Sequence, residues 1–306
     1  MNLDAFREGK EASGAYGLEA VFGAEEAEQA RRIIALALDE EGEDAAHGIF
    51  PGSDRAEASV TARERTLLAG LVLIGPVFAA MGVPRTEYGI ELLREDGDWI
   101  EENETAAVIR GRTAVLLRAG RVLLNLICHM SGVAALTARY ARMLDGTGVR
   151  LLDTRKTIPG NRCLERYAVR LGGGVNRPCH EEAQLKSVHI DAAGGMTRAV
   201  SALREKYGDD RPFLTVQCRN EAETREAVAC APDRILFDNM DVPMLDLVLP
   251  LVPASIEAEV SGGVSLNTIR PLAAAGGSRH ADYISVGRIT HSAPVSNFTL
   301  RIKRGA

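Results

Sequence analysis

Residues 213–238 read FLTVQCRNEAETREAVACAPDRILFD and decide the fold class. An apolar run at 213–217 is followed by a helical pattern at 220–229 and by a second apolar run at 234–237. A strand, a helix and a strand in this order form a βαβ unit, whose two strands lie parallel. The second strand leads into Asp238, which places a carboxylate at a strand's carboxyl end.

The same alternation continues in both directions from residue 148 onward. Six or seven such units predict a compact α/β barrel or a doubly wound parallel sheet, with functional side chains at the carboxyl ends of the strands. The predicted strands are Arg150–Leu152, Ser187–Ile190, Phe213–Gln217, Arg234–Phe237, Ser255–Val260 and Tyr283–Val286, and the predicted helices are Cys163–Leu171, Met196–Tyr207, Asn220–Ala229, Met240–Val252 and Leu266–Ala275.

The first third of the chain has a mixed pattern. Helical spacing predicts a helix at Glu25–Leu38, and Asp96-Gly97 predicts a hairpin turn between short strands. A long amphipathic helix is expected at Arg121–Asp145, with Gly120 before it. The other segments are strands at 56–68, 90–93, 99–100 and 105–117, and a strand or the start of a helix at 69–83.

Composition narrows the class of protein. The 306 residues are 46% hydrophobic and 25% charged, as in a soluble globular chain with one large or two medium domains. The net charge of -6 argues against a nucleic-acid partner. No signal peptide is recognisable, and no apolar run approaches the roughly 20 residues of a membrane span. The five cysteines form no CxxC motif, so we expect reduced thiols in the cytoplasm and no structural metal at Cys179-His180.

Residues 153–176, DTRKTIPGNRCLERYAVRLGGGVN, combine cations with turn-forming residues. Arg155 and Lys156 follow a predicted strand, and Gly172–Gly174 allow backbone to approach a ligand closely. Cations beside exposed backbone N–H groups form a site for a phosphate or carboxylate. A strand, a turn and a surface salt bridge are the simpler interpretation, but the recurrence of glycine turns near the C-terminus favours the anion site.

Two such glycine turns follow late strands. Ser261, Gly262 and Gly263 come after one strand, and Gly287 comes after the next, with His291 shortly beyond. Two glycine turns one βα unit apart predict a phosphate cradle. At the end of an earlier strand, Asp238 could serve a bound Mg²⁺ or oppose positive charge in a transition state, and equally it could cap the next helix.

Together these residues resemble the quinolinate phosphoribosyltransferase family. The similarity runs from about residue 28 to residue 302. Its motifs are RVLLNL (121–126) with Ser131-Gly132, DTRKTIPG (153–160), Tyr167-Ala168-Val169 with GGGVN (172–176), LFDNM (236–240), SGGV (261–264) and ISVGRITHS (284–292).

The resemblance implies a mixed α/β N-terminal domain at 1–119, to which 294–306 return, and an α/β barrel at 120–293 of about six to seven parallel strands. It implies a pentosyltransferase, nicotinate-nucleotide diphosphorylase (carboxylating). Such an enzyme joins quinolinate to phosphoribosyl pyrophosphate with Mg²⁺ and releases nicotinate mononucleotide, pyrophosphate and CO₂ for NAD biosynthesis. The partners are therefore these small molecules, with no nucleic acid or membrane. A homodimer or dimer-based oligomer is expected, with shared sites into which Arg121 of one copy reaches.

The resemblance also assigns roles to residues. Lys156, Lys186 and Asp238 are expected to be catalytic, with Asp238 also binding the metal. The expected substrate-binding residues are Arg121, Thr154, Arg155, Arg177, His189, Gln217, Ser261, Gly262, Gly263, Gly287 and His291.

Several positions depart from the family pattern. Arg177-Pro178 stand where the family has His-Arg, and Arg177 is interpreted as a displaced substitute for that arginine. Ser187-Val188 replace Asp-Asn, Gly120 replaces a glutamate, and Thr215 and Gln217 replace two glutamates on one strand. These changes keep two alternatives open: a family member that uses another carboxylated N-heterocycle, and a non-catalytic phosphate-binding relative.

Overall fold

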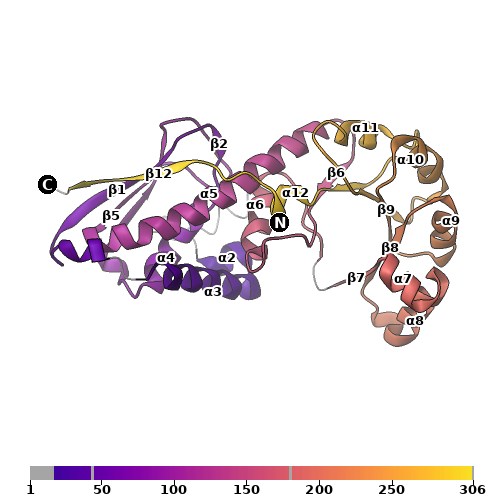
Figure 1. The fold of residues 1–306 in the computed structure, drawn as a ribbon, viewed down its shortest axis with the longest axis horizontal. Helices are drawn as coiled ribbons and strands as arrows, with labels where there is room; N and C mark the ends of the chain where they lie inside the picture. Colours follow the sequence, from indigo (N-terminus) through magenta and orange to yellow (C-terminus); the bar gives the residue numbers. More distant parts are fainter. Residues whose placement is uncertain (1–16, 43–44, 179–180, 305–306) are drawn as a thin grey trace. The chain divides into compact units, whose positions relative to one another are not determined.

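The computed structural model describes residues 17–42, 45–178 and 181–304 (Figure 1), and Cys179-His180, where no structural metal was expected, lie outside them. The chain forms two compact units. The N-terminal unit contains Met1–Ala138, Thr157–Gly172 and Ile289–Ala306. The C-terminal unit contains Arg139–Lys156 and Gly173–Arg288.

The N-terminal unit is built on a four-stranded antiparallel sheet in the order β12-β1-β5-β3. Its strands are β1 (Arg55–Ala62), β3 (Gly89–Leu92), β5 (Thr105–Arg112) and β12 (Phe298–Arg304). Ala56, Ala58 and Val60 on β1 are buried at a spacing of two, as expected for a sheet with one face on a core. β12 pairs with β1 from Ala62↔Phe298 to Ala56↔Arg304, so the C-terminal segment does return to the first sheet.

Smaller elements complete this unit. They are α2 (Leu18–Phe22), α3 (Ala24–Glu41), η1 (Ala45–Ile49), β2 (Thr66–Leu67), η2 (Leu71–Leu73), α4 (Ile74–Ala80), η3 (Arg85–Glu87), β4 (Trp99–Ile100) and α6 (Arg162–Leu171). The hairpin predicted at Asp96-Gly97 was wrong, because β3 pairs with β5 whereas β4 pairs with β2. Asp96 instead accepts from Leu71 N (2.9 Å) and from Tyr167 Oη (2.9 Å). Burial raises the pKa of this carboxyl group.

The long helix α5 (Thr113–Met143) begins earlier than predicted. The run at 113–117 continues the apolar pattern of β5 and was therefore predicted as strand, but it forms the first turns of α5. Gly120 lies inside this helix, where a Cβ would be 3.1 Å from Leu300 Cδ2, so glycine permits the close approach of β12. The predicted domain boundary at residue 120 therefore falls within α5 and stays a prediction.

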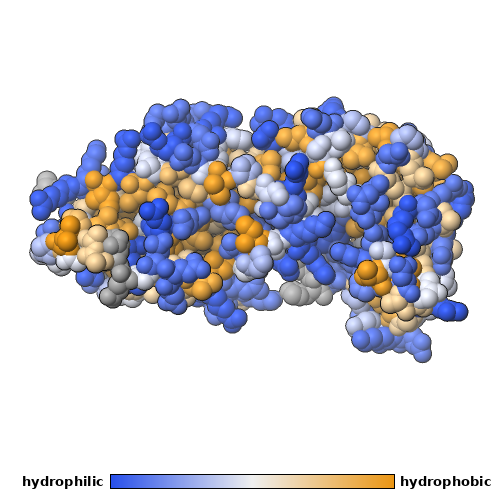
Figure 2. All heavy atoms as spheres, viewed as in Figure 1, coloured by the Kyte–Doolittle hydropathy of each residue, from blue (hydrophilic) through white to orange (hydrophobic). Residues whose placement is uncertain are grey.

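Helix α5 also has the length and apolar composition of a membrane span, which sequence inspection missed. In its most apolar window 61% of the residues are buried inside the protein, as in the core helix of a globular domain. Figure 2 shows apolar residues gathered over α5 on the visible face of the N-terminal unit. Among the described cysteines, Cys128, Cys163, Cys218 and Cys230 are free thiols.

The C-terminal unit contains a six-stranded parallel sheet in the order β6-β11-β10-β9-β8-β7, which confirms the predicted fold class. Its strands are β6 (Arg150–Leu152), β7 (Glu182–Leu185), β8 (Phe213–Cys218), β9 (Arg234–Asp238), β10 (Glu257–Ser261) and β11 (Tyr283–Ser285). Its helices are α7 (Ser187–Ala193), α8 (Met196–Tyr207), η4 (Gly208–Asp210), α9 (Glu221–Cys230), α10 (Val242–Val248), η5 (Leu249–Leu251) and α11 (Ile269–Ala274), and α12 (Arg288–His291) follows. Helices α8 to α11 lie along the outer side of the strands (Figure 1).

One predicted strand in this unit was wrong. Residues Ser187–Ile190 belong to helix α7, and the strand is the more polar segment just before it, β7. Lys186 N donates to His189 Nδ1 (3.1 Å), which closes the first turn of the helix. Gly194 ends the helix in a left-handed conformation with φ 75°.

Candidate active site

Many of the predicted site residues lie at the carboxyl ends of the parallel strands. Lys186 follows β7, Gln217 lies near the end of β8, and Asp238 and Ser261 end β9 and β10. Because all six strands are parallel, these carboxyl ends lie along one edge of the sheet. The strand pattern predicted Gln217, Asp238 and Ser261 at this edge, whereas Lys186 preceded the strand predicted at Ser187–Ile190 and was assigned from the family resemblance.

Gln217 connects two parts of this edge. Its Nε2 donates to Asp238 Oδ2 (2.8 Å), and its Oε1 accepts from Ser187 N (3.3 Å). Ser187 is the first residue of α7 and directly follows Lys186. A single amide thus fixes the Asp238 carboxylate relative to the turn that presents Lys186.

Lys186 and His189 are exposed side chains at the start of α7. His189 Nδ1 accepts from Lys186 N, so in the neutral ring the proton is on Nε2. This tautomer turns the donor nitrogen away from the backbone of the turn. An exposed ammonium and a ring N–H donor three residues apart suit the binding of an anion.

The turn after Asp238 depends on a close approach between two strands. Asn239 has φ 56° and donates its N–H to Ser261 O (2.9 Å). A Cβ on Gly262 would overlap the side chain of Asn239, so only glycine fits there. The alternative role of Asp238 as a helix cap was wrong, because Asp241 caps α10 by accepting from Met244 N (3.0 Å).

The motifs DTRKT and GGGVN are joined by the buried carboxylate of Asp153. Asp153 Oδ2 accepts from Asn176 Nδ2 (2.9 Å), and Oδ1 accepts from Arg177 N (2.6 Å). Thr154 Oγ1 accepts from Lys156 N (3.1 Å) and shapes the turn that exposes Arg155 and Lys156. The predicted basic pair is therefore exposed on a turn whose base is fixed by hydrogen bonds.

Family models match both parts of the chain. The model for the C-terminal domain of quinolinate phosphoribosyl transferase matches residues 133–301, and the model for its N-terminal domain matches residues 42–131. The chain belongs to the quinolinate phosphoribosyl transferase family. The predicted resemblance is thereby confirmed.

Individual relatives cover most of this family member. It is 35% identical to a probable nicotinate-nucleotide pyrophosphorylase (carboxylating) of Bacillus subtilis, over 79% of this chain and 81% of the relative. It is 31% identical to the chloroplastic nicotinate-nucleotide pyrophosphorylase of Arabidopsis thaliana, over 89% and 82%. The crystal structure of NadC from Streptococcus pyogenes matches with a TM-score of 0.83 and 30% identity, covering 91% of this chain and 98% of that one.

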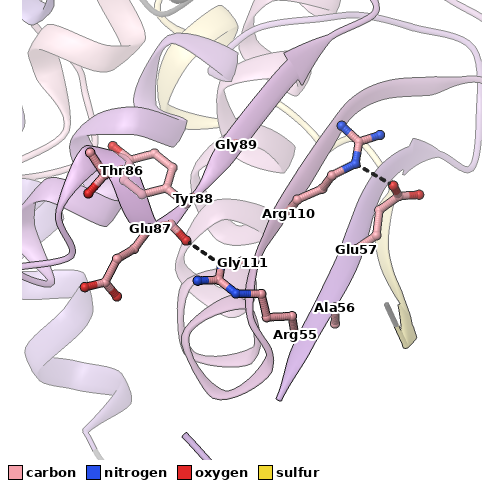
Figure 3. A pocket seen from close by; sticks show the side chains of 9 residues that line it. All are labelled: Arg55, Ala56, Glu57, Thr86, Glu87, Tyr88, Gly89, Arg110 and Gly111. Carbon is pink, nitrogen blue, oxygen red and sulfur yellow. Dashed lines mark hydrogen bonds and ion pairs between the residues drawn. The ribbon is translucent and has the colours of Figure 1, made fainter. Parts of the chain in front are cut away.

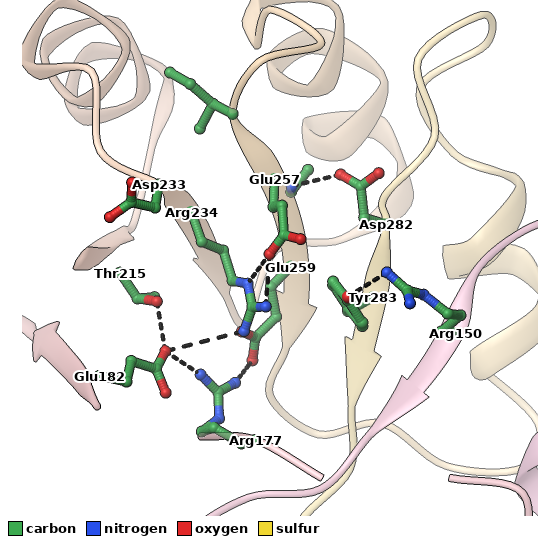
Figure 4. A network of polar contacts seen from close by, with 12 residues as sticks. Arg150, Arg177, Glu182, Thr215, Asp233, Arg234, Glu257, Glu259, Asp282 and Tyr283 are labelled. Carbon is green, nitrogen blue, oxygen red and sulfur yellow. Dashed lines mark hydrogen bonds and ion pairs between the residues drawn. The ribbon is translucent and has the colours of Figure 1, made fainter. Parts of the chain in front are cut away.

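Arg177, which was predicted to bind substrate, has an unexpected position (Figure 4). Its side chain is buried, with Nη1 donating to Glu182 Oε1 (2.6 Å) and Nη2 donating to Glu259 Oε1. Burial alone lowers the pKa of Arg177, but Glu259 and Glu182 outweigh it, so the pKa is raised. This placement argues against the predicted role in substrate binding, because the guanidinium is turned into the protein.

Arg177 belongs to a buried cluster at the amino ends of the strands, which we call the amino-end cluster. It comprises Arg177, Glu182, Thr215, Arg234, Glu257 and Glu259. Arg234 donates to Glu257 Oε2 (2.6 Å) and Glu259 Oε2 (3.4 Å), and its guanidinium stacks on Tyr283. Thr215 Oγ1 donates to Glu182. Charged residues within predicted strands were the sequence signal for this cluster, since a buried charge needs a partner.

In the N-terminal unit, the Glu165 carboxylate fixes a turn of the backbone, a role that the sequence did not reveal. It is fully buried and accepts from Ile158 N (3.3 Å), and His129 Nε2 lies 2.9 Å from its Oε1. These contacts hold the turn at Thr157–Gly160. Ser131 and Gly132 also have structural roles: Ser131 Oγ exchanges hydrogen bonds with the backbone of Ala69, and a Cβ on Gly132 would overlap the carbonyl group of Pro294.

The remaining predicted residues are placed as follows. Arg121 is exposed on α5 and His291 lies on α12, with its Nδ1 2.6 Å from Ser292 Oγ; both belong to the N-terminal unit. Gly287 and Gly263 follow β11 and β10 in the C-terminal unit. Both glycines therefore take the strand-end positions that the sequence predicted.

A cavity of about 510 Å³ opens in the N-terminal unit (Figure 3). It is lined by Arg55, Ala56, Glu57, Thr86, Glu87, Tyr88, Gly89, Arg110 and Gly111. Arg110 is paired with Glu57 (2.8 Å) and Glu91 (2.9 Å), and Arg55 donates to Glu87 O (3.1 Å). None of the predicted site residues lines this cavity.

Proposed function

We propose that this protein transfers the phosphoribosyl group of phosphoribosyl pyrophosphate to quinolinate, with loss of CO₂, in NAD biosynthesis. The products are nicotinate mononucleotide and pyrophosphate. The observation that supports this best is the hydrogen-bonded link from Asp238 through Gln217 to the turn of Lys186, in a chain that matches both family domains. Relatives such as that of Bacillus subtilis bear the corresponding name.

The charges of the substrates account for the basic residues. Quinolinate carries two carboxylates, and the sugar donor carries several phosphate charges. Arg121, Arg155, Lys156 and Lys186 are exposed cations that can pair with these anions. Further hydrogen bonds to carboxylate and phosphate oxygens would come from Thr154, His189, His291 and the glycine turns with Ser261, Gly262, Gly263 and Gly287.

The chemistry needs one negative group near the sugar. The ring nitrogen of quinolinate attacks the anomeric carbon while pyrophosphate departs, so positive charge develops on the ribose. The Asp238 carboxylate would stabilise that charge, and Lys156 and Lys186 would stabilise the departing oxygens. The carboxylate next to the ring nitrogen then leaves as CO₂, and the electron pair left on the ring carbon, stabilised by the adjacent pyridinium nitrogen, takes up a proton from solvent to give nicotinate mononucleotide.

Magnesium fits this site only as a partner of the substrate. No group of three or more His, Cys, Asp or Glu side chains suited to a metal occurs among the described residues. Mg²⁺ commonly binds through one carboxylate and substrate phosphates. We therefore assign Asp238 as its protein ligand and pyrophosphate as its main one; bound there, Mg²⁺ would neutralise charge on the leaving group.

We also propose that two copies associate through α5. Leu117, Arg121 and Leu124 share one face of this helix, and the two leucines are half-buried in the single chain. A second copy would cover these leucines and receive Arg121 at its own site. Light scattering should give twice the chain mass of 32.9 kDa, or a multiple of it.

The proposed compartment is the cytoplasm. The Arabidopsis thaliana relative is named chloroplastic, so compartment varies among relatives. Localisation of the tagged protein by microscopy or fractionation tests this assignment.

The activity is tested with purified protein, quinolinate, phosphoribosyl pyrophosphate and Mg²⁺. We expect equal amounts of pyrophosphate, CO₂ and nicotinate mononucleotide, and loss of all three after chelation of the metal. Absence of turnover at high enzyme concentration would contradict the proposal. The matched control is Lys156→Ala, which should abolish turnover and leave the thermal unfolding midpoint unchanged.

A second candidate acceptor is favoured by the buried position of Arg177, which removes one cation from the acceptor side. That candidate is another carboxylated N-heterocycle. A pyrophosphate-release screen over pyridine and related ring acids separates it from quinolinate. If none of these acids leads to the release of pyrophosphate, the result would instead favour the non-catalytic alternative.

A further inference from the structure

The parallel sheet has two edges that are not joined by a ladder of backbone hydrogen bonds in the part of the chain described. At one edge, Val175 forms a parallel bridge with Leu152, with Val175 N donating to Leu151 O (2.8 Å) and Asp153 N donating to Val175 O (3.0 Å). The segment around Val175 thus extends the sheet beyond β6. At the other edge, β7 has β8 as its partner.

Arg177 is attached to both edges. Its backbone N–H is fixed to Asp153 beyond β6, whereas its Nη1 reaches Glu182 of β7. Its Nη2 reaches Glu259 in β10, near the middle of the strand order. A residue held at one edge can contact the opposite edge only when the sheet curves round on itself, so Arg177 crosses the interior of an incomplete barrel (Figure 4).

We propose that Arg177 is a positioning residue that closes this barrel with ion pairs where a backbone ladder is missing, and so fixes the distance between the two edges. β6 leads through Asp153 to Arg155 and Lys156, and β7 leads directly to Lys186. The span of Arg177 therefore sets how far apart the two groups of substrate-binding cations lie.

The chemistry of the cluster explains why an arginine is used. The guanidinium presents donors in a planar fork, so one side chain can bind Glu182 and Glu259 at once. A lysine ammonium is a point charge and would favour one of them. Removing Arg177 alone would leave Arg234 to neutralise both buried carboxylates, and an unpaired buried charge is strongly destabilising.

The test compares variants by hydrogen exchange and by kinetics. Arg177→Met with Glu182→Gln removes the connection and one opposite charge together, so the buried charge stays balanced. Glu257→Gln is the matched control, since Glu257 contacts Arg234 at the more exposed rim of the cluster. Arg177→Lys is the second variant; it keeps the charge and loses the fork.

In the double variant we expect the amides of 173–178 and 182–186 to exchange about tenfold faster or more, while β9 and β10 keep their protection, because only the closure has opened. Arg177→Lys should show the same pattern to a smaller extent, and Glu257→Gln should exchange like the wild type. The proposal would be overturned if amide exchange accelerated equally in all strands. It would also be overturned if exchange accelerated in neither the double variant nor Arg177→Lys.

The kinetic arm rests on the proposed function. A displacement of about 1 Å between the cation groups can lower kcat by roughly 100-fold. We expect this fall in the double variant, with a smaller change in KM for quinolinate. A rise in KM for quinolinate alone, with unchanged exchange, would make Arg177 a substrate contact and refute the closure. If the wild type does not turn over quinolinate, the proposed function fails while the exchange result still decides the role of Arg177.

Discussion

The two ends of the parallel sheet use polar residues in opposite ways. At the amino ends, Arg177, Glu182, Arg234 and Glu259 are buried and pair with opposite charges. At the carboxyl ends, Lys186 and His189 are exposed, and Asp238 is held by one neutral amide. Both ends are rich in charge, so the amount of charge does not distinguish them.

The difference lies in how completely the protein itself neutralises the charge. Buried charges in ion pairs are desolvated, and their hydrogen-bonding groups are already bound to other protein groups. They therefore stabilise the shape and closure of the sheet and are not available to bind a ligand. Exposed cations beside a single carboxylate remain available to anions and to a developing positive charge. The site is therefore assigned to the carboxyl ends of the strands.

The largest effect is expected from Glu259→Gln at the amino ends. Arg177 and Arg234 would lose a shared buried carboxylate, and breaking a buried pair costs about 3–5 kcal/mol of unfolding free energy. Urea unfolding measures this loss. Activity of the folded variant should stay close to that of the wild type, because Arg177 still reaches Glu182. A stable but inactive variant would show that Glu259 takes part in catalysis, and would contradict the assignment of the site to the carboxyl ends alone.

Asp238→Asn should have the opposite profile at the carboxyl ends. Loss of the carboxylate removes stabilisation of positive charge on the ribose, so kcat should fall by about 100-fold or more. The thermal unfolding midpoint should be unchanged, because Asp238 is only half-buried. Steady-state kinetics and calorimetry on one preparation give both quantities. A large loss of stability with normal kcat would contradict the assignment.

Gln217→Ala tests the link between Asp238 and Lys186. It removes two hydrogen bonds, each worth about 0.5–1.5 kcal/mol, and we expect roughly a tenfold fall in kcat/KM. The control is Gln184→Ala on β7, which removes one hydrogen bond to the amino-end cluster. That variant should keep its kcat/KM and lose a little stability. Equal kinetic losses in the two variants would show that Gln217 has no special position.

The smallest effect is expected from Asp233→Asn, at the residue before β9. This variant should change how the free energy of unfolding depends on pH. Hydrogen bonding from Arg211 lowers the pKa of Asp233, so this group stabilises the fold above its unfolded pKa and ceases to do so as pH falls through its folded pKa. Asp233→Asn should therefore be less stable than the wild type near neutrality. The two should converge below about pH 4 in urea unfolding. A difference independent of pH would rule out the ionised form as the cause.

The parallel sheet was predictable because its strands and helices alternate with clear periods. The positions of Gln217, Asp238 and Ser261 at the carboxyl edge followed from that alternation, whereas Lys186 was assigned from the family resemblance. The returning strand β12 followed from the family resemblance. These features depend on local pattern and chain order, which a sequence displays directly.

Two features that local patterns did not reveal, β7 and the buried position of Arg177, depend on long-range contacts, whereas the early start of α5 is a local ambiguity. β7 was missed because Glu182 and Gln184 break the apolar pattern, and they are tolerated there by the amino-end cluster. Arg177 was assigned to substrate from the family resemblance, and its buried pairing was not visible in the local pattern because its partner Glu259 lies 82 residues further along the chain. The early start of α5 was hidden because 113–117 is as apolar as the strand before it. Only the folded structure shows which distant residues neutralise these side chains.

The most direct test of the account follows both products of the reaction at once. Quinolinate labelled in the carboxylate next to the ring nitrogen is incubated with phosphoribosyl pyrophosphate, Mg²⁺ and the purified protein, and CO₂ and pyrophosphate are counted. We expect one labelled CO₂ for each pyrophosphate with the wild type, and a fall of both together in Asp238→Asn. Pyrophosphate release without CO₂, or equal rates for the two proteins, would contradict it.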